Sequence, residues 1–156
     1  MKLLTTLTVA LLAASSLANA YTLNPKGKSF IAKGPTSASK GGLTIACTST
    51  FKGSINSLGV GTVTSATFTA GSALCSGVKA TGLPWKVTAT SLTTATVHKA
   101  GFTSALGNCG PNSVVLHQYG AYKSGKFTFN ATFTGGCTAK STAPLVSTPA
   151  LYVTNP

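Results

Sequence analysis

The sequence predicts an all-β protein, an antiparallel β-sandwich of the jelly-roll or Greek-key type, with a partly closed barrel as the alternative. Three observations support this prediction. Apolar and β-branched residues alternate with polar ones in short runs, glycine separates the runs, and no window after the first twenty residues keeps the 3.6-residue period of a helix. About seven or eight short strands at this spacing are typical of such a fold.

The expected strands are rich in Val, Ile, Phe, Tyr and Thr, which fit a half-buried pleated surface. The dipeptides Gly34-Pro35 and Gly110-Pro111 are predicted to be strong breaks between them. A single domain, residues 21–156, is expected to hold all the strands. The expected strands are Ser29–Lys33, Leu43–Phe51, Thr62–Thr69, Lys86–Thr90, Thr94–Val97, Ser113–Gln118, Lys126–Phe133 and Ala150–Thr154.

Residues 1–20 are predicted to be a cleaved signal peptide that takes no part in the fold. Lys2 supplies the positive start, residues 3–14 form an apolar run, and Ala18-Asn19-Ala20 is a small-residue cleavage site, so Tyr21 is the expected mature N-terminus. The apolar run is too short to span a bilayer. The mature chain is therefore expected to be a secreted or extracellular bacterial protein that passes through the periplasm and is not transmembrane.

Four cysteines, an even number, predict two disulfides in an exported chain. Four cysteines allow three pairings, and spacing alone does not choose among them. An internal repeat does help, because Ala-Thr-Phe-Thr occurs at residues 66–69 before the second cysteine and again at 131–134 before the fourth. The chain is therefore interpreted as two cysteine-bounded half-units. The predicted pairs are Cys47 with Cys75 and Cys109 with Cys137.

The absence of every aspartate and glutamate excludes much enzyme chemistry. The 12 charged residues are all lysine, and the formal net charge is +12. Without carboxylates the chain has no acid pair for glycoside hydrolysis, no acid to orient a histidine, and no oxygen cage for Ca²⁺ or Mg²⁺. His98 and His117 have no acidic partner, and neither a G-x-S-x-G elbow nor a closely spaced cysteine pair for zinc occurs. We expect no catalytic residue, no metal, no cofactor and no enzymatic activity.

Four lysines near the mature N-terminus allow two interpretations. They fall within fifteen residues, so they form a candidate site for anionic lipid or polysaccharide. Alternatively they protect an edge strand from pairing with another chain. Arginine, which suits bidentate phosphate contact, is absent, so no specific nucleic-acid partner is expected. The four are Lys26, Lys28, Lys33 and Lys40.

Trp85 follows a turn and leads into a predicted strand. It can fill the core between two sheets, which is the preferred interpretation, or it can anchor the protein at an interface. With Leu83, Tyr119 and Tyr122 it is also a candidate for an exposed apolar patch larger than about 400 Å².

Several segments, taken in order, resemble the secreted bacterial family called protein activator of alkane oxidation. The similarity covers nearly the whole mature chain, and its most specific parts are the Gly-Leu-Pro-Trp segment and the cysteine framework. The segments are Phe30–Ser37, Leu43–Gly53, Ala80–Thr90, Asn108–Pro111, Gly136-Cys137 and Thr148–Leu151.

The resemblance implies an extracellular, non-enzymatic protein that promotes growth on hydrocarbons by helping to emulsify or contact the alkane. It brings no catalytic residues to this chain. The expected partner is an apolar or anionic surface, either a hydrocarbon droplet or the outer cell surface. Two other hypotheses stay open: a structural surface or fibre subunit that self-associates through edge strands, and a cationic binder of anionic surfaces.

Overall fold

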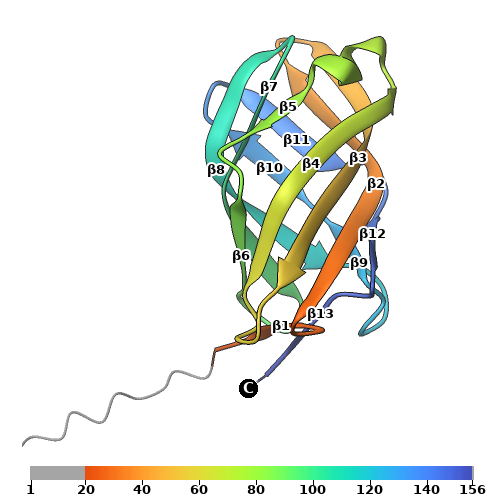
Figure 1. The fold of residues 1–156 in the computed structure, drawn as a ribbon. Helices are drawn as coiled ribbons and strands as arrows, with labels where there is room; N and C mark the ends of the chain where they lie inside the picture. Colours follow the sequence, from red (N-terminus) through yellow and green to blue (C-terminus); the bar gives the residue numbers. More distant parts are fainter. Residues whose placement is uncertain (1–19, 156) are drawn as a thin grey trace, which may run out of the picture.

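The structure, a computed structural model, describes residues 20–155 and confirms the all-β class. The described residues form strands β1 to β13 and one short 3-10 helix, η1 (Figure 1). The predicted signal peptide lies outside them apart from Ala20, and it stays a prediction. The elements are β1 (Thr22–Asn24), β2 (Lys28–Lys40), β3 (Leu43–Ile55), β4 (Gly61–Gly71), η1 (Ala73–Gly77), β5 (Lys79–Thr81), β6 (Trp85–Ala89), β7 (Thr94–Ser104), β8 (Gly107–Gln118), β9 (Lys126–Thr128), β10 (Asn130–Phe133), β11 (Cys137–Ser141), β12 (Leu145–Thr148) and β13 (Tyr152–Thr154).

The main sheet closes on itself into an eight-stranded barrel, which corrects the expected β-sandwich with jelly-roll or Greek-key connections. Around the barrel the order is β2, β3, β4, β6, β7, β8, β9, β12 and back to β2, with every pairing antiparallel. The closing contact is β2, which pairs with β3 on one side and with β12 and β11 on the other. Alternation of apolar and polar residues is the same in a sandwich and in a barrel, so it does not reveal this closure.

Some barrel strands bend and are divided into two pieces. The consecutive pieces are β5 with β6, β9 with β10, and β11 with β12. β5 and β6 both pair with β7, β11 and β12 both pair with β2, and β10 pairs with β11. β8 meets the end of β10, where the Gly110 N–H donates to the Thr134 carbonyl at 2.9 Å. The ring of paired strands is therefore complete through β6, β9 and β12, whereas at the level of β5, β10 and β11 no pairing joins β4 to β5.

Both predicted breaks lie inside long strands, which corrects their assignment as turns. Pro35 lies in β2 between the segment that pairs with β12 and the segment that pairs with β11. On this side of β2, the Pro35 carbonyl accepts the Thr142 N–H at 3.0 Å. The missing N–H of this proline therefore costs no ladder bond. Gly110 has a φ of 101° and lies where the pairing of β7 with β8 shifts register. A glycine in a bulge bends the strand without ending it.

The two ends of the barrel are closed differently (Figure 1). At one end the separate two-stranded sheet of β1 and β13, here called the cover, lies across the barrel beside loops 56–60, 90–93 and 119–125. We call this the cover end. At the other end, η1 and the turns after β2, β7 and β10 lie close to the two disulfides, and we call it the disulfide end.

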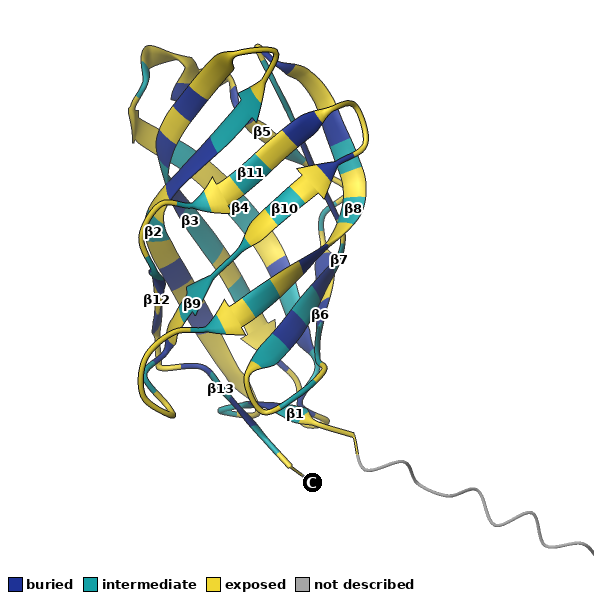
Figure 2. Ribbon diagram, turned by 180° about the vertical axis from the view of Figure 1, so that it is seen from behind, coloured by how far each residue is buried: buried dark blue, intermediate teal, exposed yellow. Residues whose placement is uncertain are grey.

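Alternate residues along each strand face the barrel interior. In β3, Ile45, Cys47 and Ser49 are buried, whereas Ala46 between the first two is exposed and Thr48 between the last two is half-buried. Figure 2 shows this alternation as bands of buried and exposed residues along the strands. Because the sheet is closed, the interior side of every strand contributes to a single core.

Candidate functional site

The barrel interior contains an apolar cavity of about 160 Å³. Eight-stranded barrels are wide enough either to be filled by side chains or to hold one small ligand. Here small residues occupy several interior positions, so the larger side chains do not fill the space. The small residues lining the cavity include Ala32, Ala38, Ala95, Ala100, Gly101 and Ala139.

The cavity lining carries no charged side chain, and its main hydroxyl pair is satisfied internally. The hydroxyls of Thr36 and Ser49 lie 2.6 Å apart and hydrogen-bond to each other, although both residues are buried. The indole N–H of Trp85 donates to the Thr81 carbonyl at 2.8 Å. Among residues 20–155, no buried side-chain nitrogen or oxygen lacks a hydrogen-bond partner. The cavity lining is therefore almost entirely apolar and is suited to an apolar molecule.

The cover end has a second feature, a group of exposed apolar side chains. Ten large hydrophobic residues are exposed among the described residues, and five of them lie in the cover end. Leu58 is the most exposed, at 74%. The loops of this end are mainly exposed in Figure 2. We call the five the apolar rim: Tyr21, Leu58, Leu92, Tyr119 and Tyr122.

Direct contacts hold the loops of the apolar rim together. The Leu23 N–H in β1 donates to the Gly59 carbonyl at 2.9 Å, which joins the cover to loop 56–60. The rings of Tyr122 and Tyr152 pack edge to face, with centroids 5.8 Å apart, and join loop 119–125 to β13. The Lys123 ammonium lies 4.6 Å from the centre of the Tyr152 ring. The exposed apolar groups therefore lie on connected loops.

The structure separates the four predicted interface residues. Trp85 is buried in the barrel, 6% exposed, as the preferred core interpretation predicts, and it is removed from the interface candidates. Leu83 is half-buried and packs against the core. Tyr119 and Tyr122 are 53% and 57% exposed and lie together in loop 119–125. Two of the four thus belong to the apolar rim.

The four predicted anion-binding lysines are exposed, but they do not form one cluster. β2 is fully extended, so Lys28 and Lys40 at its two ends are separated by the length of the barrel, roughly 40 Å along the strand. Lys26 lies beside the cover end, and Lys33 lies in the barrel wall. β2 carries the other three of the four and has partners on both sides, so these three lysines do not protect an edge strand.

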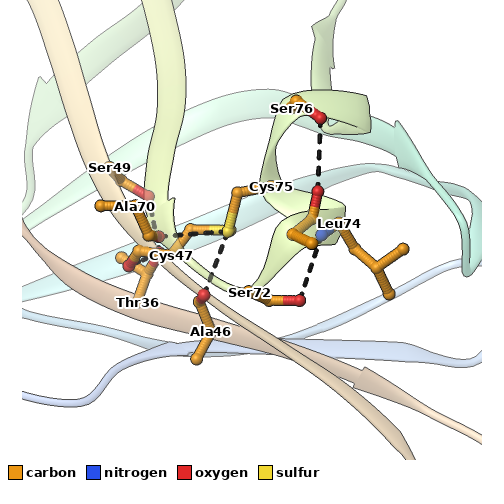
Figure 3. The surroundings of a disulfide bond; sticks show 10 residues. Thr36, Ala46, Cys47, Ser49, Ala70, Ser72, Leu74, Cys75 and Ser76 are labelled. Carbon is orange, nitrogen blue, oxygen red and sulfur yellow. Dashed lines mark hydrogen bonds between the residues drawn. A yellow bond between two sulfur atoms is a disulfide. The ribbon is translucent and has the colours of Figure 1, made fainter.

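The disulfide end is fixed covalently (Figure 3). The bonds join Cys47 to Cys75 and Cys109 to Cys137, which confirms the predicted pairing. The first bond ties β3 to η1, where the Ser72 hydroxyl caps the helix by accepting the Leu74 N–H at 3.2 Å. All four cysteines are at least 90% buried. Two disulfides indicate folding in an oxidising extracellular or periplasmic compartment.

The two histidines lie apart from any other candidate ligand. His98 Nε2 forms a hydrogen bond of 2.7 Å with the Thr88 hydroxyl, and His117 is exposed in β8. In the part of the chain that the structure describes, no three metal-ligating side chains come together. None of its helices is long and apolar enough to cross a membrane.

These features define a class of protein: a disulfide-linked, closed β-barrel with an apolar interior and one exposed apolar end. Residues 1–155 match the family described as alkane oxidation protein activator PraA/PraB-like. The chain therefore belongs to this family, as the segments resembling it predicted. No match was found to a curated protein or to a solved structure.

Sequence reasoning missed the cavity and three residues of the apolar rim. Leu58 and Leu92 are isolated leucines between predicted strands, and Tyr21 was noted only as the expected N-terminus. An apolar residue at the centre of a short polar turn is the signal that could have identified both leucines, because a turn of this kind projects its tip into solvent.

Proposed function

We propose that the protein promotes alkane oxidation from outside the cytoplasm, without catalysis, by adsorbing through its apolar rim to the interface between hydrocarbon and water. The observation that supports this most strongly is the gathering of five exposed apolar side chains on connected loops at one end. Family membership supplies the alkane. Adsorption at the surface of a hydrocarbon droplet or of the cell brings the hydrocarbon and the cell into contact, and so aids uptake or emulsification.

The energetics favour such adsorption. Each Å² of apolar surface removed from water contributes about 25 cal/mol, so a contact of about 400 Å² contributes on the order of 10 kcal/mol. The ring and hydroxyl of tyrosine suit a boundary with one wet and one apolar side. The chain has no carboxylate that such contact would have to dehydrate.

The two other hypotheses have less support. A fibre subunit needs long open edge strands, and each of the eight strands that close the barrel has a partner on both sides. A cationic binder needs clustered charge, and the lysines of β2 are spread along the barrel. Lys26, Lys28 and Lys123 do lie at the cover end, where they favour an anionic droplet or cell surface as a secondary attraction.

The test compares leucines at the two ends. Interfacial tension between hexadecane and buffer is measured with the purified mature protein, with size distribution measured in parallel. Wild type is expected to lower the tension as a monomer, and the double variant Leu58→Ser/Leu92→Ser is expected to lose at least half of this effect. The matched control is Leu43→Ser/Leu74→Ser, which removes exposed leucines from the disulfide end. Equal losses in both variants, or large ordered assemblies without surface activity, would contradict the proposal.

A further inference from the structure

We propose that the barrel interior is a binding site for an unbranched alkyl chain, with the cavity of about 160 Å³ as the place where it binds. This proposal depends on the proposed function in one respect: it assumes that hydrocarbon reaches the protein. The site itself is argued from the barrel, and it is separate from the apolar rim on the outside.

The chemistry of the lining determines the class of ligand. Phenylalanine, isoleucine, valine and alanine side chains surround the cavity, and no lysine or histidine is among them. The Thr36 and Ser49 hydroxyls are already bonded to each other, so they attract neither water nor a polar ligand. Apolar protein cavities of about 150 Å³ stay free of water and bind apolar molecules of about the size of benzene. A hydrocarbon segment of about six carbons therefore fits by size and by polarity.

The extent of the lining favours a chain over a compact molecule. Ile45 and Ile55 lie at opposite ends of β3, and both line the cavity. Leu151, beneath the cover, and Phe133, beside the Cys109–Cys137 disulfide, also line it. The apolar lining thus runs from one end of the barrel to the other, while the cavity volume is only about 160 Å³. A long and narrow space matches an unbranched alkyl chain.

The interior positions explain why the space exists. Ala32 in β2 and Ala95 in β7 point inward, where larger residues normally fill a barrel of eight strands. An empty apolar cavity lowers stability in proportion to its volume, and an occupant that restores the lost contacts raises it. Replacement of either alanine by leucine would place side-chain carbons where the ligand is proposed to lie.

The cover end provides the path into the cavity. Both disulfides tie the opposite end, whereas the cover is attached without any covalent cross-link of its own. Leu23 and Val153 close the barrel from the cover by apolar contact. This closure can open locally while the barrel sheet stays intact. The apolar rim surrounds the same end, so adsorbed hydrocarbon would lie next to the path.

Trp85 provides a direct readout, because it is the only tryptophan of the chain and it lines the cavity. The probe is 1-bromohexane, whose bromine quenches tryptophan fluorescence at short range. We expect saturable quenching in the wild-type protein and its reversal by excess n-hexane. Quenching that rises linearly without saturation would show surface partitioning and would overturn the proposal.

Matched variants locate the probe. Ala95→Leu and Ala32→Leu are expected to weaken 1-bromohexane binding at least tenfold, because the added carbons occupy the cavity. The control Ala46→Leu adds the same carbons on the exposed side of β3 and should leave binding unchanged. If Ala95→Leu fails to fold by circular dichroism, Ala95→Val adds less volume and should show an intermediate loss. Unchanged quenching in the folded filled variants would overturn the proposal.

The outcomes separate this site from the proposed function. Hexadecane interfacial tension is measured on the same filled variants, and we expect it to match wild type because their apolar rim is intact. Saturable quenching in a protein without surface activity would support the interior site and reject the adsorption proposal. Surface activity in a protein without saturable quenching would reject the interior site alone.

Discussion

The two ends of the barrel differ in covalent cross-linking and in exposed apolar surface. The disulfide end carries both cross-links, with cysteines almost completely buried, and only Leu43 and Leu74 are large exposed hydrophobic residues there. The cover end has no cross-link among its described residues, is closed by a two-stranded sheet, and exposes the five side chains of the apolar rim. The covalent cross-links and the largest group of exposed apolar side chains therefore lie at opposite ends of the barrel.

The largest expected effect concerns the disulfide end. Replacing Cys109 and Cys137 together by serine should lower the free energy of unfolding by about 3 to 4 kcal/mol, because the bond closes a loop of about 29 residues in the unfolded chain. Urea denaturation measures the change. Replacing Cys47 and Cys75 by serine removes a bond that closes a loop of the same length, and it serves as the matched comparison. A midpoint equal to wild type in either variant would show that this end does not secure the fold.

A smaller effect is expected at the cover. Leu23→Ala should cost about 2 kcal/mol, at the low end for a buried leucine, because the affected strands can open by themselves. Amide hydrogen exchange should accelerate in β1 and β13 and stay slow in β3 and β8. The control Leu58→Ala changes an exposed leucine at the same end and should stay within about 0.5 kcal/mol of wild type. Faster exchange throughout the barrel would contradict an independently opening cover.

The fold was predictable as far as local pattern determines it. Alternation located most of the long strands, and the repeated Ala-Thr-Phe-Thr segment led to both disulfide pairs, because it lies in β4 and at the end of β10, each leading to the second cysteine of its pair. Closure was missed because it depends on the pairing of β2 with β11 and β12, far apart in the sequence. The short strands β5, β11 and β12 were missed because they are pieces of bent strands without a long alternating run.

The candidate site was predictable only in part. Tyr119 and Tyr122 stand out as aromatic residues in a glycine-containing loop, and both are exposed. From the sequence, the Trp85 side chain could lie on either face of the sheet. It is buried because the pairing of β6 with β4, in which Trp85 lies opposite Val63, turns it toward the barrel interior. The cavity could not be predicted, because its volume depends on the sum of side chains such as Ala32 and Ala95 from separate strands.

Salt dependence separates the apolar rim from the lysines. Adsorption to hexadecane should change less than about twofold between about 50 and 500 mM salt, because apolar burial is not screened, whereas charges are screened within a few ångströms at the higher value. Droplet adsorption assays measure it, with Lys26→Gln/Lys28→Gln at the cover end and Lys40→Gln as the control at the disulfide end. A steep loss of adsorption with salt, together with weaker adsorption of Lys26→Gln/Lys28→Gln but not of Lys40→Gln, would make the lysines of the cover end the binding site.

The smallest expected effect on surface activity and stability is that of replacing the two histidines, because neither belongs to the apolar rim or to a disulfide. His98→Gln/His117→Gln should leave surface activity unchanged and alter the free energy of unfolding by at most about 0.5 kcal/mol, because both residues lie at the barrel surface and no carboxylate partners them. Alkane-dependent growth of cells supplied with the double variant checks the functional part. Loss of the growth effect in a folded variant would reopen an enzymatic role.

The central claim is that the cover end is the face that meets hydrocarbon. Hydrogen exchange of the protein adsorbed on hexadecane droplets, compared with the protein in buffer, tests it most directly. We expect slower exchange in loops 56–60, 90–93 and 119–125 and no change in η1 or in the turn between β7 and β8. Slower exchange confined to the disulfide end, or spread evenly over both ends, would contradict it.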